Sequence, residues 1–277
     1  MEKIAIQLWK KNDIDEDEFK NILVKKVPSS LADILSNYQV NIVDKDVQDA
    51  SGLIQSSYPP SPDAIVFLKV KSLFHAEKEL KVFESSSKKV FSYVVSESKI
   101  IEADESKNLN KRTEGFSQIV FLEKPKEMDR FAWFDHWTHH HTEIAIETQS
   151  NFIYTQNTVV RNLQKESPNF IAIIEECFPE GAMSDPEEFY AAKGNKELLE
   201  KNYTVIEKIS KICSDNGLFL IEDTAWGLGG KLNGKYLGTL GDAGTFSFDH
   251  AKIISTGEGG MIAFNKKKPA FMVGFFR

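Results

Sequence analysis

The chain has 277 residues, of which 41 % are hydrophobic and 27 % are charged, and its formal net charge is −7. This composition supports a normal globular core, and the length fits one large domain or two of ordinary size. The negative charge argues against a general nucleic-acid binder or a protein of anionic membrane surfaces, since both need a basic face. No apolar run approaches the roughly 20 residues that span a bilayer, so we expect no membrane segment.

The N-terminus and the cysteines predict a cytoplasmic protein. The first residues turn acidic within MEKIAIQLWKKNDIDEDEF and show no signal-peptide cleavage pattern. Cys177 and Cys213 lie far apart and form no metal-type pair, which is typical of reduced structural thiols.

Residues 1–104 predict a β-α-β-β-α-β order of elements. A helix with apolar residues at helical spacing follows the first expected strand, and a short helix at 75–83 precedes the fourth. The expected strands are rich in β-branched and aromatic residues and lie at 4–9, 38–43, 63–70 and 89–95. This order is that of the split ferredoxin-like unit.

The pattern restarts after a charged, Asn-rich linker at 105–115. Asp185 is expected to cap the second helix of the new unit, with Pro186 at its first position. Further strands are expected at 116–123, 151–160 and 169–178, and helices at 128–147 and 185–213. A repeat of about 110 residues indicates duplication of a whole domain, and two such units can pair their sheets into one α+β barrel. The second unit, 116–205, lacks a fourth strand of its own, and LFLIED (218–223) could fill that place.

From about residue 206 the chain reads as an α/β protein with parallel strands. A helix ends at Asn-Gly, a strand ends in Asp223, and a Gly-rich stretch leads to TFSF, Lys252, STGEGG and the strand MIAF. Pyridoxal phosphate chemistry needs a lysine, an acid beneath the pyridine nitrogen, and hydroxyl or N–H groups for the phosphate. Asp223, Lys252 and Ser247 could converge on one end of such a sheet.

The first two-thirds of the chain resembles a tandem EthD-type protein of the dimeric α+β barrel class. The resemblance depends on the helix Phe134-Asp-His-Trp137-Thr-His-His-His141 and on the strand Tyr154-Thr-Gln-Asn157. Members of this class resemble small barrels that enclose apolar or aromatic ligands, so Trp137, His141 and Tyr154 are candidate pocket residues. No metal site is expected, because consecutive histidines on a helix point about 100° apart and His136 with His140 lacks a completing carboxylate.

Residues 206–265 resemble the DegT-type sugar aminotransferases. The residues that carry the resemblance are IEDTAWGLGG and KYLGTLGDAGTFSFDHAKIISTGEGGMI. The family implies the aspartate-aminotransferase fold, a pyridoxal 5′-phosphate cofactor, and a nucleotide-linked keto-sugar and an amino donor as substrates. On that basis Lys252 is the Schiff-base lysine, Asp223 the pyridinium partner and Ser247 a phosphate contact. Trp226 stands where the family usually has Gln or His contacting the cofactor.

We therefore expect an α+β protein: tandem ferredoxin-like repeats at 1–104 and 116–205, then a partial aspartate-aminotransferase-type α/β segment at 206–277. The first functional hypothesis is a pyridoxal-phosphate-dependent sugar aminotransferase segment. The family's Gly-Ser/Thr phosphate turn and ring-stacking aromatic residue are not found in 1–205, so a homodimer would have to complete the site. The alternative is an EthD-type barrel that binds or transforms a small apolar or aromatic molecule, with an inactive appended fragment. A third hypothesis is a fusion or truncation with neither activity.

Overall fold

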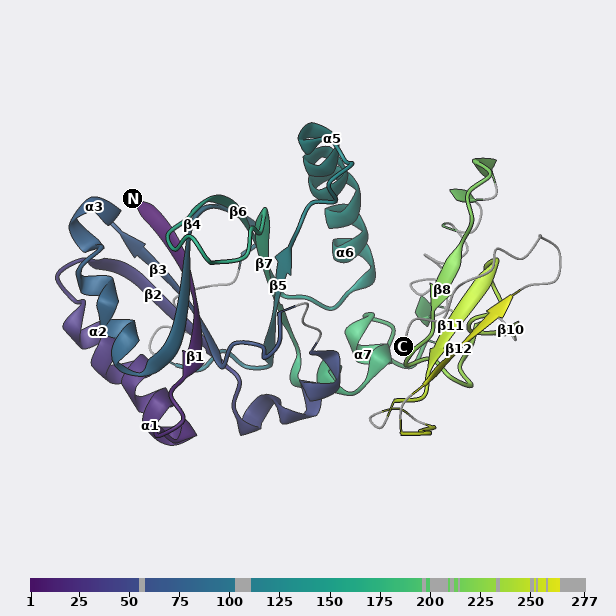
Figure 1. The fold of residues 1–277 in the computed structure, drawn as a ribbon, viewed down its shortest axis with the longest axis horizontal. Helices are drawn as coiled ribbons and strands as arrows, with labels where there is room; N and C mark the ends of the chain where they lie inside the picture. The colour runs from purple at the N-terminus through teal and green to yellow at the C-terminus, as the bar shows by residue number, and fades with distance from the viewer. Residues whose placement is uncertain are drawn as a thin grey trace. The chain divides into compact units, whose positions relative to one another are not determined.

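The structure is a computed structural model that divides into two compact units, Met1–Ala191 (unit 1) and Ala192–Arg277 (unit 2) (Figure 1). The structure describes residues 1–54, 58–102, 111–195, 198–199, 209, 212–213, 215–232, 235–249, 252, 254–257 and 259–264. None of the helices in these ranges is long and apolar enough to cross a bilayer.

Unit 1 is built on one antiparallel sheet with the strand order β2-β3-β1-β4-β6-β7-β5. The order β2-β3-β1 in the first half recurs as β6-β7-β5 in the second, as duplication predicts. The strands are β1 (Glu2–Lys10), β2 (Leu35–Ile42), β3 (Ala64–Val70), β4 (Ser87–Ile101), β5 (Phe116–Leu122), β6 (Ile153–Asn162) and β7 (Ala172–Phe178). The expected strand at 89–95 is longer than predicted, because β4 pairs along its first half with β1 and along its second half with β6.

The helices of the two halves also correspond. In each half a helix is capped by an aspartate whose carboxylate accepts the N–H three residues on, Asp15 at 2.7 Å and Asp129 at 3.1 Å. In each half a π-helical turn interrupts the helix at the same stage. The elements are α1 (Glu16–Asn21), η1 (Ile22–Lys26) and α2 (Val27–Ser30) in the first half, and α5 (Arg130–Asp135), η4 (His136–His141) and α6 (Thr142–Thr148) in the second.

Short helices make the remaining connections of unit 1. Asp185 caps α7 as predicted, with its carboxylate accepting the N–H of Glu187 at 2.9 Å and Pro186 at the first helical position. The helix expected over 185–213 is wrong in its first part, because α7 ends at Phe189 and residues 190–195 form turns; much of the remainder lies outside the described residues. The short elements are η2 (Lys45–Leu53), α3 (Leu73–Ala76), η3 (Glu79–Ser85), η5 (Glu180–Met183) and α7 (Pro186–Phe189).

Side chains alternate between the two faces of the sheet along most of each strand, apart from the register shifts in β1, β2 and β4. Even-numbered residues such as Ile4, Leu68 and Ile174 pack under the helices. Odd-numbered residues such as Trp9, Tyr93 and Ile173 form a separate core on the opposite face. Figure 1 shows α1, α2 and α3 on one side of the first-half strands, with α5 and α6 beyond β5 and β7. The sheet thus encloses the odd-numbered face and carries its helices outside, as an α+β barrel does.

The barrel is incomplete in the described part of the chain. In the first half β4 lies beside β1, but no described strand takes the matching place beside β5. β2 and β5 are therefore the two edges of the seven-stranded sheet. The interpretation of LFLIED as the missing strand is wrong, because Ile221–Asp223 pairs in parallel with a strand of unit 2 instead.

Unit 2 contains a three-stranded sheet of order β12-β11-β8 and a two-stranded hairpin. β8 and β11 are parallel, and β12 runs antiparallel to β11. The strands are β8 (Ile221–Asp223), β9 (Lys231–Leu232), β10 (Lys235–Tyr236), β11 (Ala243–Ser247) and β12 (Gly260–Phe264). The expected parallel pair is therefore present, and β12 gives it a third strand.

Candidate functional site

The carboxyl ends of β8 and β11 bring two of the predicted site residues to one end of the small sheet. Asp223 is the last residue of β8 and is aligned with Thr245 of β11, and Ser247 ends β11 two residues later. Carboxyl ends of neighbouring parallel strands lie at the same edge, which is where open α/β sheets bind ligands. Asp223 is exposed, and its carboxylate accepts the N–H of Ala225 at 3.0 Å.

Lys252 is held in the loop that leaves this edge. Its backbone N–H donates to Asp249 O at 3.0 Å, and the N–H of Asp249 donates to Ser247 Oγ at 3.4 Å. The Lys252 Nζ atom lies 3.6 Å from the centre of the Trp226 ring, a cation–π contact. The indole is 53 % exposed, and Lys252 is half-buried. The structure thus places Trp226 against the amine.

Glu222 fixes the backbone around this edge, and the sequence analysis did not select it. Its carboxylate is 8 % exposed and accepts three backbone N–H groups, from Gly238 at 2.7 Å, Leu240 at 2.5 Å and Gly241 at 2.6 Å. Three donors on one buried carboxylate hold the Gly-rich loop against β8. The available signal was the acid at an inward position of the apolar strand LFLIED, next to the exposed Asp223.

Glycine is required where this loop crosses β11. Gly238 has φ +84°, and a Cβ there would lie 2.4 Å from the Phe246 ring. A Cβ on Gly244 would lie 2.3 Å from the carbonyl oxygen of Gly238. The spacing of glycines in GTLGDAG therefore reflects close backbone packing beside the candidate site.

The three candidate barrel residues lie apart from the enclosed face. Trp137 is buried between helix and sheet, with its ring 5.1 Å from that of Trp133, and Tyr154 belongs to the same cluster. Tyr154 Oη accepts a hydrogen bond from Gln156 at 3.1 Å, and His141 is exposed on η4. Within the described ranges, no group of three or more His, Cys, Asp or Glu side chains is arranged to hold a metal ion.

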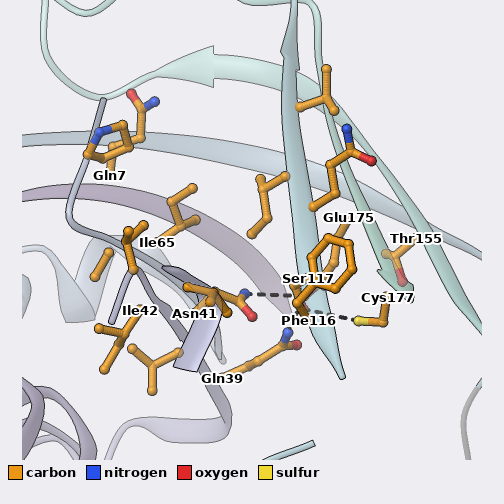
Figure 2. A pocket seen from close by; sticks show the side chains of 18 of the residues that line it. Gln7, Gln39, Asn41, Ile42, Ile65, Phe116, Ser117, Thr155, Glu175 and Cys177 are labelled. Atoms are coloured by element: carbon orange, nitrogen blue, oxygen red, sulfur yellow. Dashed lines mark hydrogen bonds between the residues drawn. The ribbon is translucent and has the colours of Figure 1, made fainter. Parts of the chain in front are cut away.

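A cavity of about 1490 Å³ occupies the odd-numbered face of unit 1. Trp137, His141 and Tyr154 do not line it. Aromatic residues form part of its wall, and Figure 2 shows Gln39 and Asn41 facing Glu175 across it. Successive residues of β2 and β5, not only the inward alternate ones, line the cavity, as expected where strand edges border an opening.

Four charged side chains gather on the enclosed face. Glu97 pairs with both Lys3 and Lys69. Burial acts to raise the pKa of Glu97, but the hydrogen bonds from the two lysines outweigh it and the pKa is lowered. Burial raises the pKa of Glu175 and lowers the pKa of Lys3. Sequence reasoning missed Glu175, although its signal was an acid at an inward position of the apolar strand NFIAIIEECF.

Two family models match different parts of the chain. Residues 202–277 match the DegT/DnrJ/EryC1/StrS aminotransferase family, and residues 125–206 match the EthD domain. Both resemblances predicted from the sequence are confirmed. The DegT match includes all four candidate residues at the end of the β8–β11 sheet: Asp223, Trp226, Ser247 and Lys252. The EthD match includes the second half of the barrel from α5 onward.

GDP-perosamine synthases match the C-terminal part of the chain over a short stretch. The chain is 50 % identical over 62 residues to GDP-perosamine synthase of Escherichia coli O157:H7, and 48 % identical over 60 residues to that of Vibrio cholerae. Each match covers 22 % of this chain, and 17 % and 16 % of the respective relative. An uncharacterized protein of Methanocaldococcus jannaschii is 32 % identical over 137 residues, which are 48 % of this chain and 34 % of that protein.

Solved structures resemble the chain only distantly. The alignment with an anthrone oxidase-like protein covers 75 % of this chain and 85 % of that protein, with a TM-score of 0.43 and 10 % sequence identity. The alignment with a mutant chlorite dismutase from Candidatus Nitrospira defluvii covers 73 % of this chain and 94 % of that protein, with a TM-score of 0.38 and 10 % sequence identity.

Proposed function

We propose that the C-terminal segment binds pyridoxal 5′-phosphate and serves a sugar aminotransferase. The observation that carries this proposal is the placement of an amine, Lys252, against the half-exposed ring of Trp226, on the loop that leaves β11 beside the end of β8. An amine, a carboxylate, a hydroxyl and an aromatic face at one sheet edge match the aldehyde, the pyridine nitrogen, the phosphate and the ring of this cofactor. The DegT match supports the same assignment.

Each residue then has a distinct part. Lys252 would attach the cofactor through its side-chain amine, Asp223 would keep a proton on the pyridine nitrogen, and Ser247 would bind the phosphate. Trp226 would pack beside the ring in place of a polar contact. The bound group supplies an electron sink for moving an amino group. The substrates proposed are a nucleotide-linked keto-sugar and an amino donor, in the cytoplasm, with a second subunit of a homodimer contributing further contacts.

Borohydride trapping tests this assignment directly. The full chain is incubated with pyridoxal phosphate, reduced and digested, and the labelled lysines are identified by mass spectrometry. We expect the label on Lys252, with little on Lys231 and Lys235 of the same unit, and its loss in Lys252→Arg. Equal labelling of all three lysines, or unchanged total labelling in the variant, contradicts the proposal.

A second candidate function is binding of a small apolar or aromatic molecule by the barrel. The observation that favours it is the cavity of about 1490 Å³ on the enclosed face, which is larger than typical ligand pockets. Titration with naphthalene, followed through the methyl signals of isoleucines, tests it. We expect shifts of the cavity residues Ile65 and Ile119, and none of Ile144 and Ile146, which are exposed residues of α6 outside the cavity lining.

A further inference from the structure

Glu175 is a buried acid on the enclosed face whose carboxylate is only partly hydrogen-bonded within the described residues. Its side chain is 3 % exposed and lines the cavity. Gln39 and Asn41 both donate to the same oxygen, Oε1, the latter at 3.2 Å (Figure 2). The other oxygen, Oε2, accepts no hydrogen bond from any residue in the described ranges. A buried carboxylate with one unused oxygen points to a partner that occupies the cavity.

The charges around Glu175 restrict that partner to a neutral molecule. Lys3 and Lys69 are both bound to Glu97 and not to Glu175. Because both amines are already paired with Glu97, neither is left to balance an added buried charge beside Glu175, and an uncharged partner avoids that cost in either protonation state of Glu175.

The partner must also suit either protonation state of Glu175. Burial favours the protonated form, in which Oε2 donates, whereas the ionised form only accepts. A hydroxyl group can donate and accept, so it can pair with Oε2 in both states.

Apolar side chains next to Glu175 indicate an aromatic body for the ligand. Ile119 is aligned with Glu175 on β5, and Phe121 follows at the next inward position. The Phe121 and Phe170 rings lie 5.0 Å apart, and Tyr58 packs edge-on against Phe170 at 5.8 Å. These side chains all line the cavity, and flat rings pack well against such a wall.

We propose that Glu175 anchors a neutral aromatic alcohol inside the barrel, with the hydroxyl on Oε2 and the ring against Ile119, Phe121 and Phe170. This inference depends on the barrel-binding function and adds the chemical class and the anchoring residue. It is independent of the cofactor proposed for unit 2.

The test titrates the full chain with four probes of one size: 1-naphthol, naphthalene, 1-naphthoate and 1-naphthylmethylamine. Affinities are measured by calorimetry and the binding place by isoleucine methyl shifts. We expect 1-naphthol to bind about three- to tenfold more tightly than naphthalene, the value of one hydrogen bond, and the two charged probes to bind more weakly still. Shifts should appear at Ile65 and Ile119 and not at Ile262 of unit 2.

Matched variants assign the effect to one side chain. Glu175→Leu should lower 1-naphthol affinity to that of naphthalene, while Glu176→Leu should leave it unchanged. Glu176 is a buried glutamate on the same strand but on the helix side, where it accepts from Asn151 at 3.1 Å. The four-probe comparison uses the unaltered chain, so it decides the matter even if a variant does not fold.

The outcomes separate the two levels of inference. Equal affinity for 1-naphthol and naphthalene, tighter binding of a charged probe, or full affinity in Glu175→Leu overturns the role of Glu175 but leaves barrel binding in place. Absence of shifts at Ile65 and Ile119 with every probe overturns both.

Discussion

Replacing Glu222 by Gln perturbs the Gly-rich loop of unit 2 without changing side-chain size. The native carboxylate accepts Gly238 N–H through Oε2, and Leu240 and Gly241 N–H through Oε1. An amide offers one oxygen, so at least one backbone donor then faces an N–H₂ group. Hydrogen bonds to a charged group contribute about 1.5–3 kcal/mol each, and an unsatisfied buried donor costs about 1–3 kcal/mol. We expect local opening to become easier by about 2 kcal/mol.

Amide hydrogen exchange on the full chain measures this opening. A change of about 2 kcal/mol corresponds to roughly 30-fold faster exchange at Gly238 and Gly241. Amides of β1 serve as the internal reference. Asp223→Asn is the matched control, because the neighbouring carboxylate is exposed and, within the described residues, accepts only the N–H of Ala225. Unchanged exchange in Glu222→Gln, or equal acceleration in Asp223→Asn, would refute the assigned role.

Three further substitutions probe separate features. Trp226→Leu should slow pyridoxal-phosphate labelling at Lys252 about two- to tenfold, because the ring that packs beside the cofactor is lost; an unchanged or faster rate would contradict that packing. The pKa of the Glu97 carboxyl is lower in the folded than in the unfolded chain. The group therefore stabilises the fold at pH values above its unfolded pKa, and this stabilisation is lost as the pH falls through its folded pKa. The difference in urea midpoint between the wild type and Glu97→Gln should therefore shrink on acidification, and a constant difference would contradict this. Asp15→Ala should weaken the start of α1 by about 1 kcal/mol, read from exchange at the Glu18 amide, whereas Asp17→Ala should not.

The repeat could be predicted because its signals are local. Alternating apolar residues mark strands, and Asp-led helix starts mark the same stage of both halves, so element order followed from the sequence. The pairing of the second half of β4 with β6 could not be predicted in this way. Pairing of Ser96–Ile101 with β6 depends on contacts between residues about 60 positions apart, which leave no local pattern.

For the candidate cofactor site of unit 2, the sequence predicts which residues belong to it but not which of them touch. Asp223, Ser247 and Lys252 were selected by residue type and resemblance, and the structure adds that Lys252 lies on the Trp226 ring. Glu222 and Glu175 were missed for one reason. Each is an acid within an apolar strand, and the sequence does not say whether such an acid meets backbone donors, as Glu222 does, or amide side chains and a cavity, as Glu175 does.

The free edges of β2 and β5 have a kinetic consequence for the barrel. A ligand that enters a closed barrel must wait for strands to separate, and its association rate then levels off at the rate of opening. Here the cavity is bordered by both edges within the described chain, so a small molecule can enter without breaking the ladder. The observed association rate should therefore rise in proportion to ligand concentration without a plateau. The residence time of the ligand should then depend on its contacts with the residues that line the cavity.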